Sequence, residues 1–289
     1  MRKFRIADVN LIIQASDSYI HKDLSCFETR EVVNHEIGDI VCVVQREQQT
    51  RTLMEGKIII DSEYLKVFEV GDDLWLEYPT DRYCILVSLK PADGQAYCYI
   101  QNLEEDSKEL EVDVCNCLFY VYRDIFFFFA QLQGRIAVHS SSILYKNKAY
   151  AFSASAGTGK TTHTNYWMDE YGVEILDGDV CMVYPKGDKV YAYGLPWAGT
   201  SGRFINRRAE LGGVIFISQS THNHAGILKY FDGVIQLCAR CFTPTWTGNM
   251  VDMNLATSGR IVARVPIFYF GCLPNRDSVE TIKDLIDAI

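Results

Sequence analysis

One stretch of the chain decides its fold: Tyr150-Ala151-Phe152-Ser153-Ala154-Ser155-Ala156-Gly157-Thr158-Gly159-Lys160-Thr161-Thr162. It begins with an apolar run that predicts a strand, passes through small residues and opens a predicted helix. This order is the context of a phosphate-binding P-loop with the pattern G-x-x-x-x-G-K-[ST]. Ala154 replaces the first glycine, which is costly only if the backbone there needs a positive φ. An ordinary glycine-containing turn before a helix is the alternative.

The residue types of this loop suit a polyphosphate. Small residues let consecutive backbone N–H groups curl around phosphate oxygens, and the helix N-terminus adds the positive end of its dipole. Lys160 can reach the β- and γ-phosphates, and the hydroxyl of Thr161 can hold Mg²⁺. We therefore predict that ATP and Mg²⁺ are bound by Ser155, Ala156, Gly157, Thr158, Gly159, Lys160, Thr161 and Thr162.

Two carboxylates follow the next predicted strand. The helix is expected over residues 161–171, with Gly172 after it, and a strand over 173–176 leads into Asp177-Gly178-Asp179. Carboxylates at the end of a strand beside a P-loop are what a Mg²⁺ site requires. A solvated Asp-Gly turn is the alternative.

The P-loop lies in the second of two halves of the chain, which differ in the secondary structure that their sequence patterns predict. The first half is β-rich, and the spacing of its turns suggests an antiparallel sheet. Residues 114–133 lack Gly and Pro and predict a largely buried helix that ends at Gly134, with a buried strand as the alternative. The predicted fold class is α/β (α+β), with a β-rich N-terminal domain at 1–134 and a P-loop domain at 135–289. Strands are expected at 40–44, 57–60, 73–78, 97–100, 136–138, 149–152, 190–193, 213–217 and 265–270, and a terminal helix at 277–289.

Composition excludes several classes of function. The 289 residues are 48% hydrophobic, which supports a real core, and 28 basic against 37 acidic residues give a net charge of −9. Nonspecific binding to nucleic acid or to an anionic membrane is not expected at this net charge. The start of the chain predicts no signal peptide, and the most apolar segment, 117–132, is too short and too polar to span a bilayer. Ten cysteines without a leader predict reduced thiols in the cytoplasm.

Three further groups of residues are candidates for binding. Arg203, Arg207 and Arg208 suit recognition of phosphate or carboxylate, and a solvated basic loop is equally compatible. Trp197 is expected to pack rather than to cover the site, and Arg240 to be a surface or ion-paired residue. A zinc site is the less favoured interpretation of one set, because its cysteines also have the helical spacing of a core: His222, His224, Cys238 and Cys241.

Several motifs together resemble one superfamily. The segments 139–142, 155–161 and 177–179, with Pro196-Trp197-Ala198-Gly199-Thr200 and Cys272-Leu273-Pro274, are similar to the phosphoenolpyruvate carboxykinase and HPr serine kinase superfamily, and most of all to its small bacterial HPr kinase-like members. The resemblance covers roughly residues 135–289.

The resemblance implies roles for individual residues. His139 stands where the family has a histidine close to the transferring phosphate, although chemistry alone would favour a core histidine at a strand end. Asp179 matches the second carboxylate of the family's Asp-Asp pair, which implies Mg²⁺ binding or activation of the acceptor. Gly178 stands where the first carboxylate would be, so that Asp177 is out of register and the division between base and metal ligand stays open.

The sequence thus predicts an ATP-dependent kinase that requires Mg²⁺ and transfers the γ-phosphoryl group to a hydroxyl on a peptide, a protein or a small molecule. His139, Lys160, Asp177 and Asp179 are the candidate catalytic residues, and Thr161 and Asp179 the candidate metal ligands. A nucleotide-binding regulatory protein without turnover is the alternative, and a carboxykinase ranks lowest. A homo-oligomer is compatible with the sequence.

Overall fold

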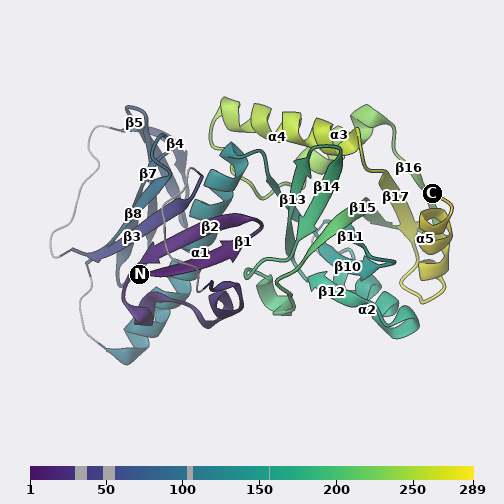
Figure 1. The fold of residues 1–289 in the computed structure, drawn as a ribbon, viewed down its shortest axis with the longest axis horizontal. Coiled ribbons are helices and arrows are strands. Elements are labelled where there is room, and N and C mark those ends of the chain that lie inside the picture. The colour runs from purple at the N-terminus through teal and green to yellow at the C-terminus, as the bar shows by residue number, and fades with distance from the viewer. Residues whose placement is uncertain (30–37, 48–55, 103–106, 156) are drawn as a thin grey trace. The chain divides into compact units, whose positions relative to one another are not determined.

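A computed structural model of the chain describes residues 1–29, 38–47, 56–102, 107–155 and 157–289. The chain is mixed α/β, with two sheets and several helices (Figure 1). It divides into two compact units, which we call unit 1 and unit 2. Unit 1 comprises Met1–Gln133 and Pro244–Met250, and unit 2 comprises Gly134–Thr243 and Val251–Ile289. Within the described ranges, no helix has the length and apolar character that crossing a bilayer demands.

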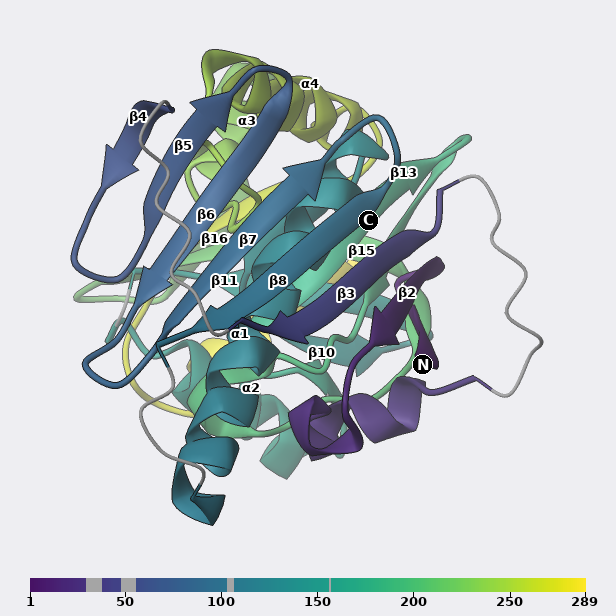
Figure 2. The ribbon, with the colours of Figure 1, turned by 90° about the vertical axis from the view of Figure 1, so that its left-hand side faces the viewer.

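Unit 1 is built around one sheet in the order β1-β2-β3-β8-β7-β6-β5-β4, whose central strands lie side by side in Figure 2. The expected antiparallel sheet is wrong for β3, which is parallel to both β2 and β8. Parallel pairing needs a long connection, and the two short helices η1 (Asp17–Tyr19) and η2 (Lys22–Phe27) lie between β2 and β3. The strands are β1 (Arg2–Ile6), β2 (Val9–Gln14), β3 (Ile40–Arg46), β4 (Lys57–Asp61), β5 (Lys66–Val70), β6 (Asp73–Pro79), β7 (Cys84–Lys90) and β8 (Gln95–Gln101).

The predicted buried helix is confirmed as α1 (Lys108–Leu132). It begins six residues before the expected start because Ser107 caps it, accepting a hydrogen bond on its side chain from the backbone N–H of Leu110. It ends before Gly134, whose φ of +75° suits the left-handed backbone that follows many helices.

A later segment of the chain returns to complete unit 1. The buried side-chain amide of Gln131 donates to the backbone oxygens of Pro244 and Met250. Phe128 of α1 stacks on Trp246, with ring centroids 5.9 Å apart and planes 16° from parallel. These contacts explain why residues 244–250 belong to unit 1, although they lie far along the chain.

Unit 2 contains a second sheet in the order β12-β10-β11-β15-β14-β13-β9, with β17 paired to β15 and β16 to β17. The long strand β15 is parallel to β11 and to β17. The strands are β9 (Ile136–His139), β10 (Ser141–Tyr145), β11 (Lys148–Ser153), β12 (Glu174–Asp177), β13 (Val180–Lys186), β14 (Lys189–Tyr193), β15 (Arg208–Gln219), β16 (His224–Ile227) and β17 (Ile267–Cys272). The helices are α2 (Lys160–Tyr171), the short η3 (Gly199–Ser201), α3 (Tyr230–Cys238), α4 (Gly248–Val262, which starts in the returning segment) and α5 (Ser278–Asp287).

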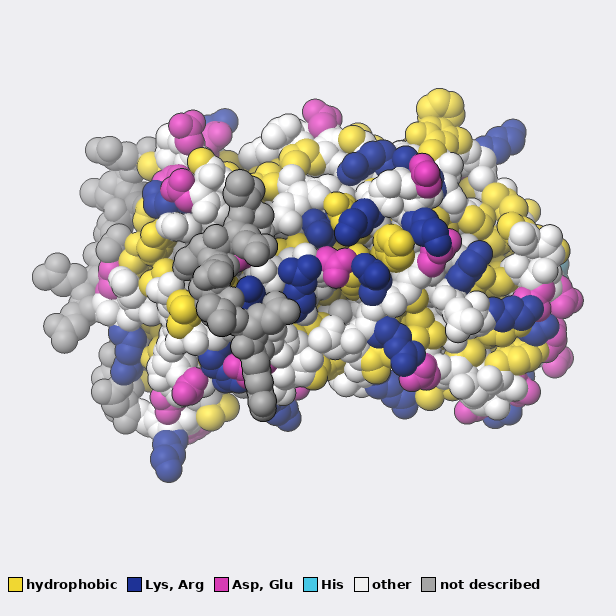
Figure 3. All heavy atoms as spheres, in the orientation of Figure 1, with side chains coloured by type: hydrophobic (Ala, Val, Ile, Leu, Met, Phe, Trp, Pro, Cys, Tyr) yellow, Lys and Arg dark blue, Asp and Glu magenta, His cyan; other side chains and the backbone are white. Residues whose placement is uncertain are grey.

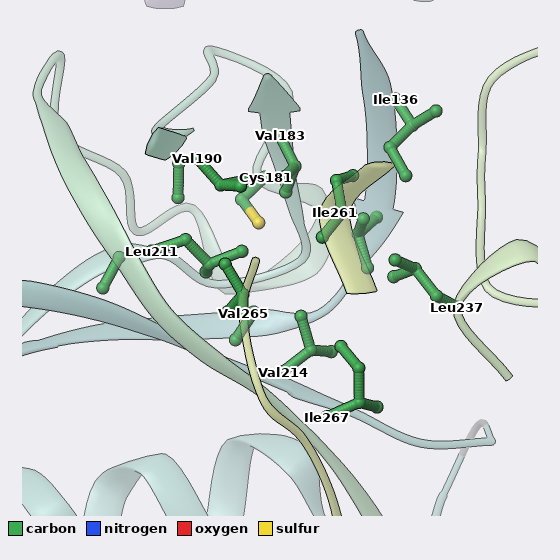
Figure 4. Close-up of a cluster of buried hydrophobic side chains, with 14 of the residues drawn as sticks. Ile136, Cys181, Val183, Val190, Leu211, Val214, Leu237, Ile261, Val265 and Ile267 are labelled. Atoms are coloured by element: carbon green, nitrogen blue, oxygen red, sulfur yellow. The ribbon is translucent and has the colours of Figure 1, made fainter. Parts of the chain in front are cut away.

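Both faces of this second sheet are buried. Along β15, Val214 and Phe216 point into one apolar cluster, which Figure 4 shows together with Leu237 and Ile261 from the helical side. Ile215 and Ile217 point into the other cluster, which contains Trp167 of α2 and Ile282 of α5. Burial on both faces accounts for the nearly continuous apolar runs in the sequence of these strands.

The expected strands and helices of unit 2 are confirmed within a few residues. The sequence interpretation omitted β10, β13, β16 and the helix α4, and it placed only the second half of β15. All ten cysteines are free thiols, in agreement with the expected reduced state.

Candidate functional site

A glycine-rich loop connects β11 to α2. Gly157 and Gly159 have φ angles of +75° and +106°, and a Cβ atom on either would meet nothing within 4 Å. These glycines are needed for backbone conformation and not for lack of space. Ala154 is buried and is not in the left-handed region, so the missing first glycine causes no strain. Ala156 lies outside the described residues.

Lys160 is the first residue of α2 and turns back over the loop. Its Nζ lies 3.0 Å from Nε2 of His139 and 3.4 Å from the backbone oxygen of Ala154. Burial lowers the pKa of Lys160; the charge of Asp179 acts in the opposite sense, and the charge of Arg240 lowers that pKa further. The ammonium group is therefore partly desolvated and surrounded by the other charged groups of the site.

His139 ends β9 and lies between Lys160 and Asp179. Its Nε2 is 3.5 Å from Oδ1 of Asp179, and its backbone pairs with Val180 across the sheet. An ammonium nitrogen can only donate, so the 3.0 Å contact with Lys160 is a hydrogen bond in the tautomer that carries its proton on Nδ1. The structure thus brings together three of the four predicted catalytic residues.

Asp177 is placed differently from the other three. It is fully buried, and its two carboxylate oxygens accept backbone N–H bonds from Asp179, Val180 and Leu195 at 3.0, 3.0 and 2.8 Å. Burial raises the pKa of Asp177 to about 7, although the three N–H donors favour the charged form. The carboxylate shapes the turn that presents Asp179 and does not face the cluster.

Two glycines allow close packing at this turn. A Cβ atom on Gly178 would collide with the side chain of Ser201, and a Cβ atom on Gly199 would collide with the carboxylate of Asp179. The Pro-Trp-x-Gly-Thr segment of the sequence therefore packs directly over the acidic turn. No second carboxylate fits at position 178 unless the loop around Ser201 moves.

Arg240, expected to be a surface or ion-paired residue, is partly buried and lies beside the glycine-rich loop. Its Nη2 donates to Oγ of Ser155 at 2.9 Å, and its Nε is buried without a hydrogen-bond partner among the described residues. The residue reaches the loop because the chain after α3 adds to the edge strand β9: the N–H of His139 donates to the backbone oxygen of Arg240 at 2.9 Å. This pairing is tertiary, and no local pattern in the sequence predicts it.

A cavity of about 410 Å³ adjoins the other side of the loop. It forms because β11, β15 and β17 run in the same direction and end together. Its walls come from the loop and the first turns of α2, from Gln219 and Ser220 after β15, and from residues 272–274 after β17. Thr162 lines the cavity, whereas Thr161 is exposed at the start of α2.

The remaining candidates have structural explanations. Trp197 is buried, as expected. Arg207 pairs with Glu174 at 2.6 Å, Arg203 donates to Asn165, and Arg208 lies over the ring of Tyr191. Lys and Arg side chains gather on the face of unit 2 that Figure 3 shows.

The alternative of a zinc site has no support in the structure. Among the described residues, no three or more His, Cys, Asp or Glu side chains come together as metal ligands, and Cys241 packs against the core of unit 2.

Comparisons with known proteins show a remote relationship to solved structures. No protein-family model matches the chain, and no curated protein matches it in sequence. Among solved structures, the chain is similar to the Hpr(Ser) kinase/phosphatase from Coxiella burnetii, with a TM-score of 0.32 and 12% identity over 53% of this chain and 88% of that chain. At this TM-score and this sequence identity, the fold relationship is remote.

Proposed function

We propose that unit 2 binds ATP with Mg²⁺ and transfers the γ-phosphoryl group to a hydroxyl acceptor. The observation that carries this proposal is the contact of Lys160 with His139, 3.0 Å away, at the start of a helix that a glycine loop opens. The loop supplies backbone N–H groups, Lys160 supplies a positive charge, and His139 and Asp179 supply groups that accept a proton or hold a metal.

The residues of the loop fit the phosphate chain of a nucleotide. The open space beside Gly157 and Gly159 lets their backbone approach a ligand closely. Arg240 lies near Lys160, and its buried Nε has no hydrogen-bond partner in the part of the chain that the structure describes, so two cations can share the charge of the phosphates. The nucleoside would occupy the cavity beside Thr162, whose walls include Tyr166 and Leu273.

Thr161 and Asp179 would hold Mg²⁺, which when bound neutralises charge on the phosphate oxygens. Carboxylate and hydroxyl oxygens suit this hard cation better than an imidazole nitrogen does. Asp177 is occupied by three backbone N–H groups, so Asp179 is the carboxylate of this turn that can serve a metal. This assignment leaves His139 to accept the proton of the acceptor hydroxyl.

The transfer can then be described in terms of the residues. The acceptor oxygen forms a bond to the γ-phosphorus while the bond to the bridging oxygen of ADP breaks. Nε2 of His139 takes the hydroxyl proton once the phosphates have drawn Lys160 away from it. Lys160 and Arg240 stabilise the charge that develops on the leaving group, and most of the catalysis is positioning and electrostatics.

One observation favours a second function, a nucleotide-binding regulatory protein without turnover. The acidic turn offers one carboxylate to the site, because Asp177 is bound to the backbone and Gly178 has no side chain. Such a protein would bind ATP with Mg²⁺ but would phosphorylate nothing.

Two variants separate the proposals. Lys160→Ala should weaken ATP–Mg²⁺ binding in calorimetry by about 10- to 100-fold, because it removes charge-assisted hydrogen bonds, while Lys189→Ala, an exposed lysine paired with Glu210, should not. Asp179→Asn should slow transfer from γ-labelled ATP to a library of serine, threonine and tyrosine peptides by on the order of 10³-fold. Exposed Asp188→Asn is its control.

The outcomes distinguish the two functions. ATP binding by the wild type without transfer to any acceptor, or to water, would establish the regulatory alternative. Unchanged ATP affinity in Lys160→Ala would contradict both functions.

A further inference from the structure

The segment after α3 brings an aromatic side chain to the site as well as Arg240. The N–H of Phe242 donates to the backbone oxygen of Ala137 at 2.7 Å, and the N–H of His139 donates to the oxygen of Arg240. Val138 and Cys241 form an antiparallel bridge between these two bonds. Residues 240–242 therefore extend the sheet beyond β9, and this pairing fixes where their side chains lie.

The ring of Phe242 lies flat against the ring of His139. Their centroids are 4.6 Å apart and their planes are 14° from parallel. Phe242 remains 45% exposed, so its position is not explained by burial in a core. On the imidazole, Nε2 is at the same time 3.0 Å from Nζ of Lys160. The stack on one face and the ammonium group at one edge together define the orientation of the ring.

We propose that Phe242 is a positioning residue that holds the imidazole of His139 in the orientation needed to receive the proton of the acceptor. This inference rests on the proposed function, and it deepens that function by assigning a role to a residue outside the loop and the acidic turn. Phe242 acts through His139, on whose ring its own ring stacks.

The physical need for such a residue follows from the freedom of a histidine side chain. The second side-chain torsion of histidine has a broad energy profile, so the ring can rotate unless neighbours restrain it. When a nucleotide draws Lys160 to the phosphates, the ring loses the contact at its edge and keeps the stack with Phe242. A misplacement of about 1 Å in a reacting group costs on the order of 100-fold in rate.

The test combines kinetics with a signal that does not depend on turnover. Phe242→Ala should lower kcat by roughly 10- to 100-fold and leave the KM for ATP unchanged, whereas Phe242→Tyr, which keeps the ring, should restore most of kcat. Phe231→Ala removes a phenylalanine of α3 that is 77% exposed, and it should change nothing. In NMR spectra of the full chain without nucleotide, the ring protons of His139 should lose the upfield shift that the stacked ring imposes in Phe242→Ala and keep it in Phe242→Tyr.

Unchanged His139 resonances in Phe242→Ala would overturn the inference. If the wild type does transfer phosphate, an equal kcat in Phe242→Ala would also overturn it. A wild type without any transfer contradicts the proposed function instead, and the NMR comparison still decides whether Phe242 orients the imidazole. A loss of thermal stability in Phe242→Ala that Phe242→Tyr also shows would assign the residue a merely structural role and would likewise overturn the proposal.

Discussion

The sheets of the two units bury their side chains differently. In unit 1, the strands β6 and β8 alternate between buried and partly exposed positions over much of their length. In unit 2, β11 is buried at five of its six positions, and β13 is nearly as closed. A sheet that is buried on both faces leaves polar side chains mainly to its strand ends. His139, Asp177 and the glycine-rich loop all lie at such ends.

The comparison predicts that changes in unit 1 affect stability without affecting the site, and the largest effect should come from its core. Leu76 on β6 is fully buried, so Leu76→Ala should lower the free energy of unfolding by about 2 to 5 kcal/mol. Urea denaturation measures this loss, and Ile58→Ala on β4, where the side chain is 56% exposed, is the control. A change in ATP affinity of the folded Leu76→Ala protein would break the comparison.

In unit 2, a buried histidine should make the stability of the protein depend on pH. His163 on α2 accepts a hydrogen bond from Trp167, and burial lowers its pKa to about 4. Between pH 6.5 and 4 the unfolded chain binds a proton that the folded protein excludes. The free energy of unfolding should therefore fall by about 3 kcal/mol as the pH drops through this range.

Urea denaturation at several pH values, compared between the wild type and His163→Gln, isolates this effect. The comparison is needed because Asp177 acts in the opposite sense: burial raises its pKa, which favours the folded protein as the pH falls. Exposed His222→Gln should keep the dependence of the wild type. An equally steep loss of stability in His163→Gln would show that another group is responsible.

A substitution at Asp177 has the smallest expected effect on stability, and it should also affect the candidate site. In Asp177→Asn, an amide NH₂ group replaces one of the oxygens that accept backbone N–H bonds, and two donors then face each other. The free energy of unfolding should fall by about 1 to 3 kcal/mol, and phosphoryl transfer should slow because the turn that presents Asp179 loosens. Denaturation and transfer assays on the same preparation measure both effects, with Asp188→Asn as the control. A full loss of transfer at unchanged stability would instead indicate that Asp177 takes part in the chemistry.

The sequence predicted the parts of the site that are contiguous in the chain. The loop and the start of α2 follow from their glycines and from Lys160, since their geometry depends on the local backbone. The two aspartates of the acidic turn are alike in sequence, and only the fold shows that Asp177 faces backbone N–H groups from the segment at Leu195. Arg240 and Phe242 reach the site through pairing with β9, which links residues about 100 positions apart.

In unit 1, too, local sequence patterns predict individual elements but not the pairing of distant segments. The helix α1 and the strands β3, β4, β6 and β8 follow from apolar runs, turn residues and the glycine after the helix, whereas β1, β2, β5 and β7 were not predicted. The parallel register of β3 and the return of residues 244–250 depend on contacts between distant parts of the chain, such as those of Gln131. No spacing within the first 134 residues could have indicated either.

The returning segment of unit 1 bears on how the protein is made. During synthesis the ribosome releases the first 133 residues long before Pro244–Met250, which Gln131 and Phe128 require as partners. Unit 1 therefore lacks part of its core while the glycine-rich loop emerges from the ribosome. Domains usually mature in the order of their translation, but here unit 1 reaches its final form only after Pro244–Met250, more than 100 residues beyond Gln133, has left the ribosome.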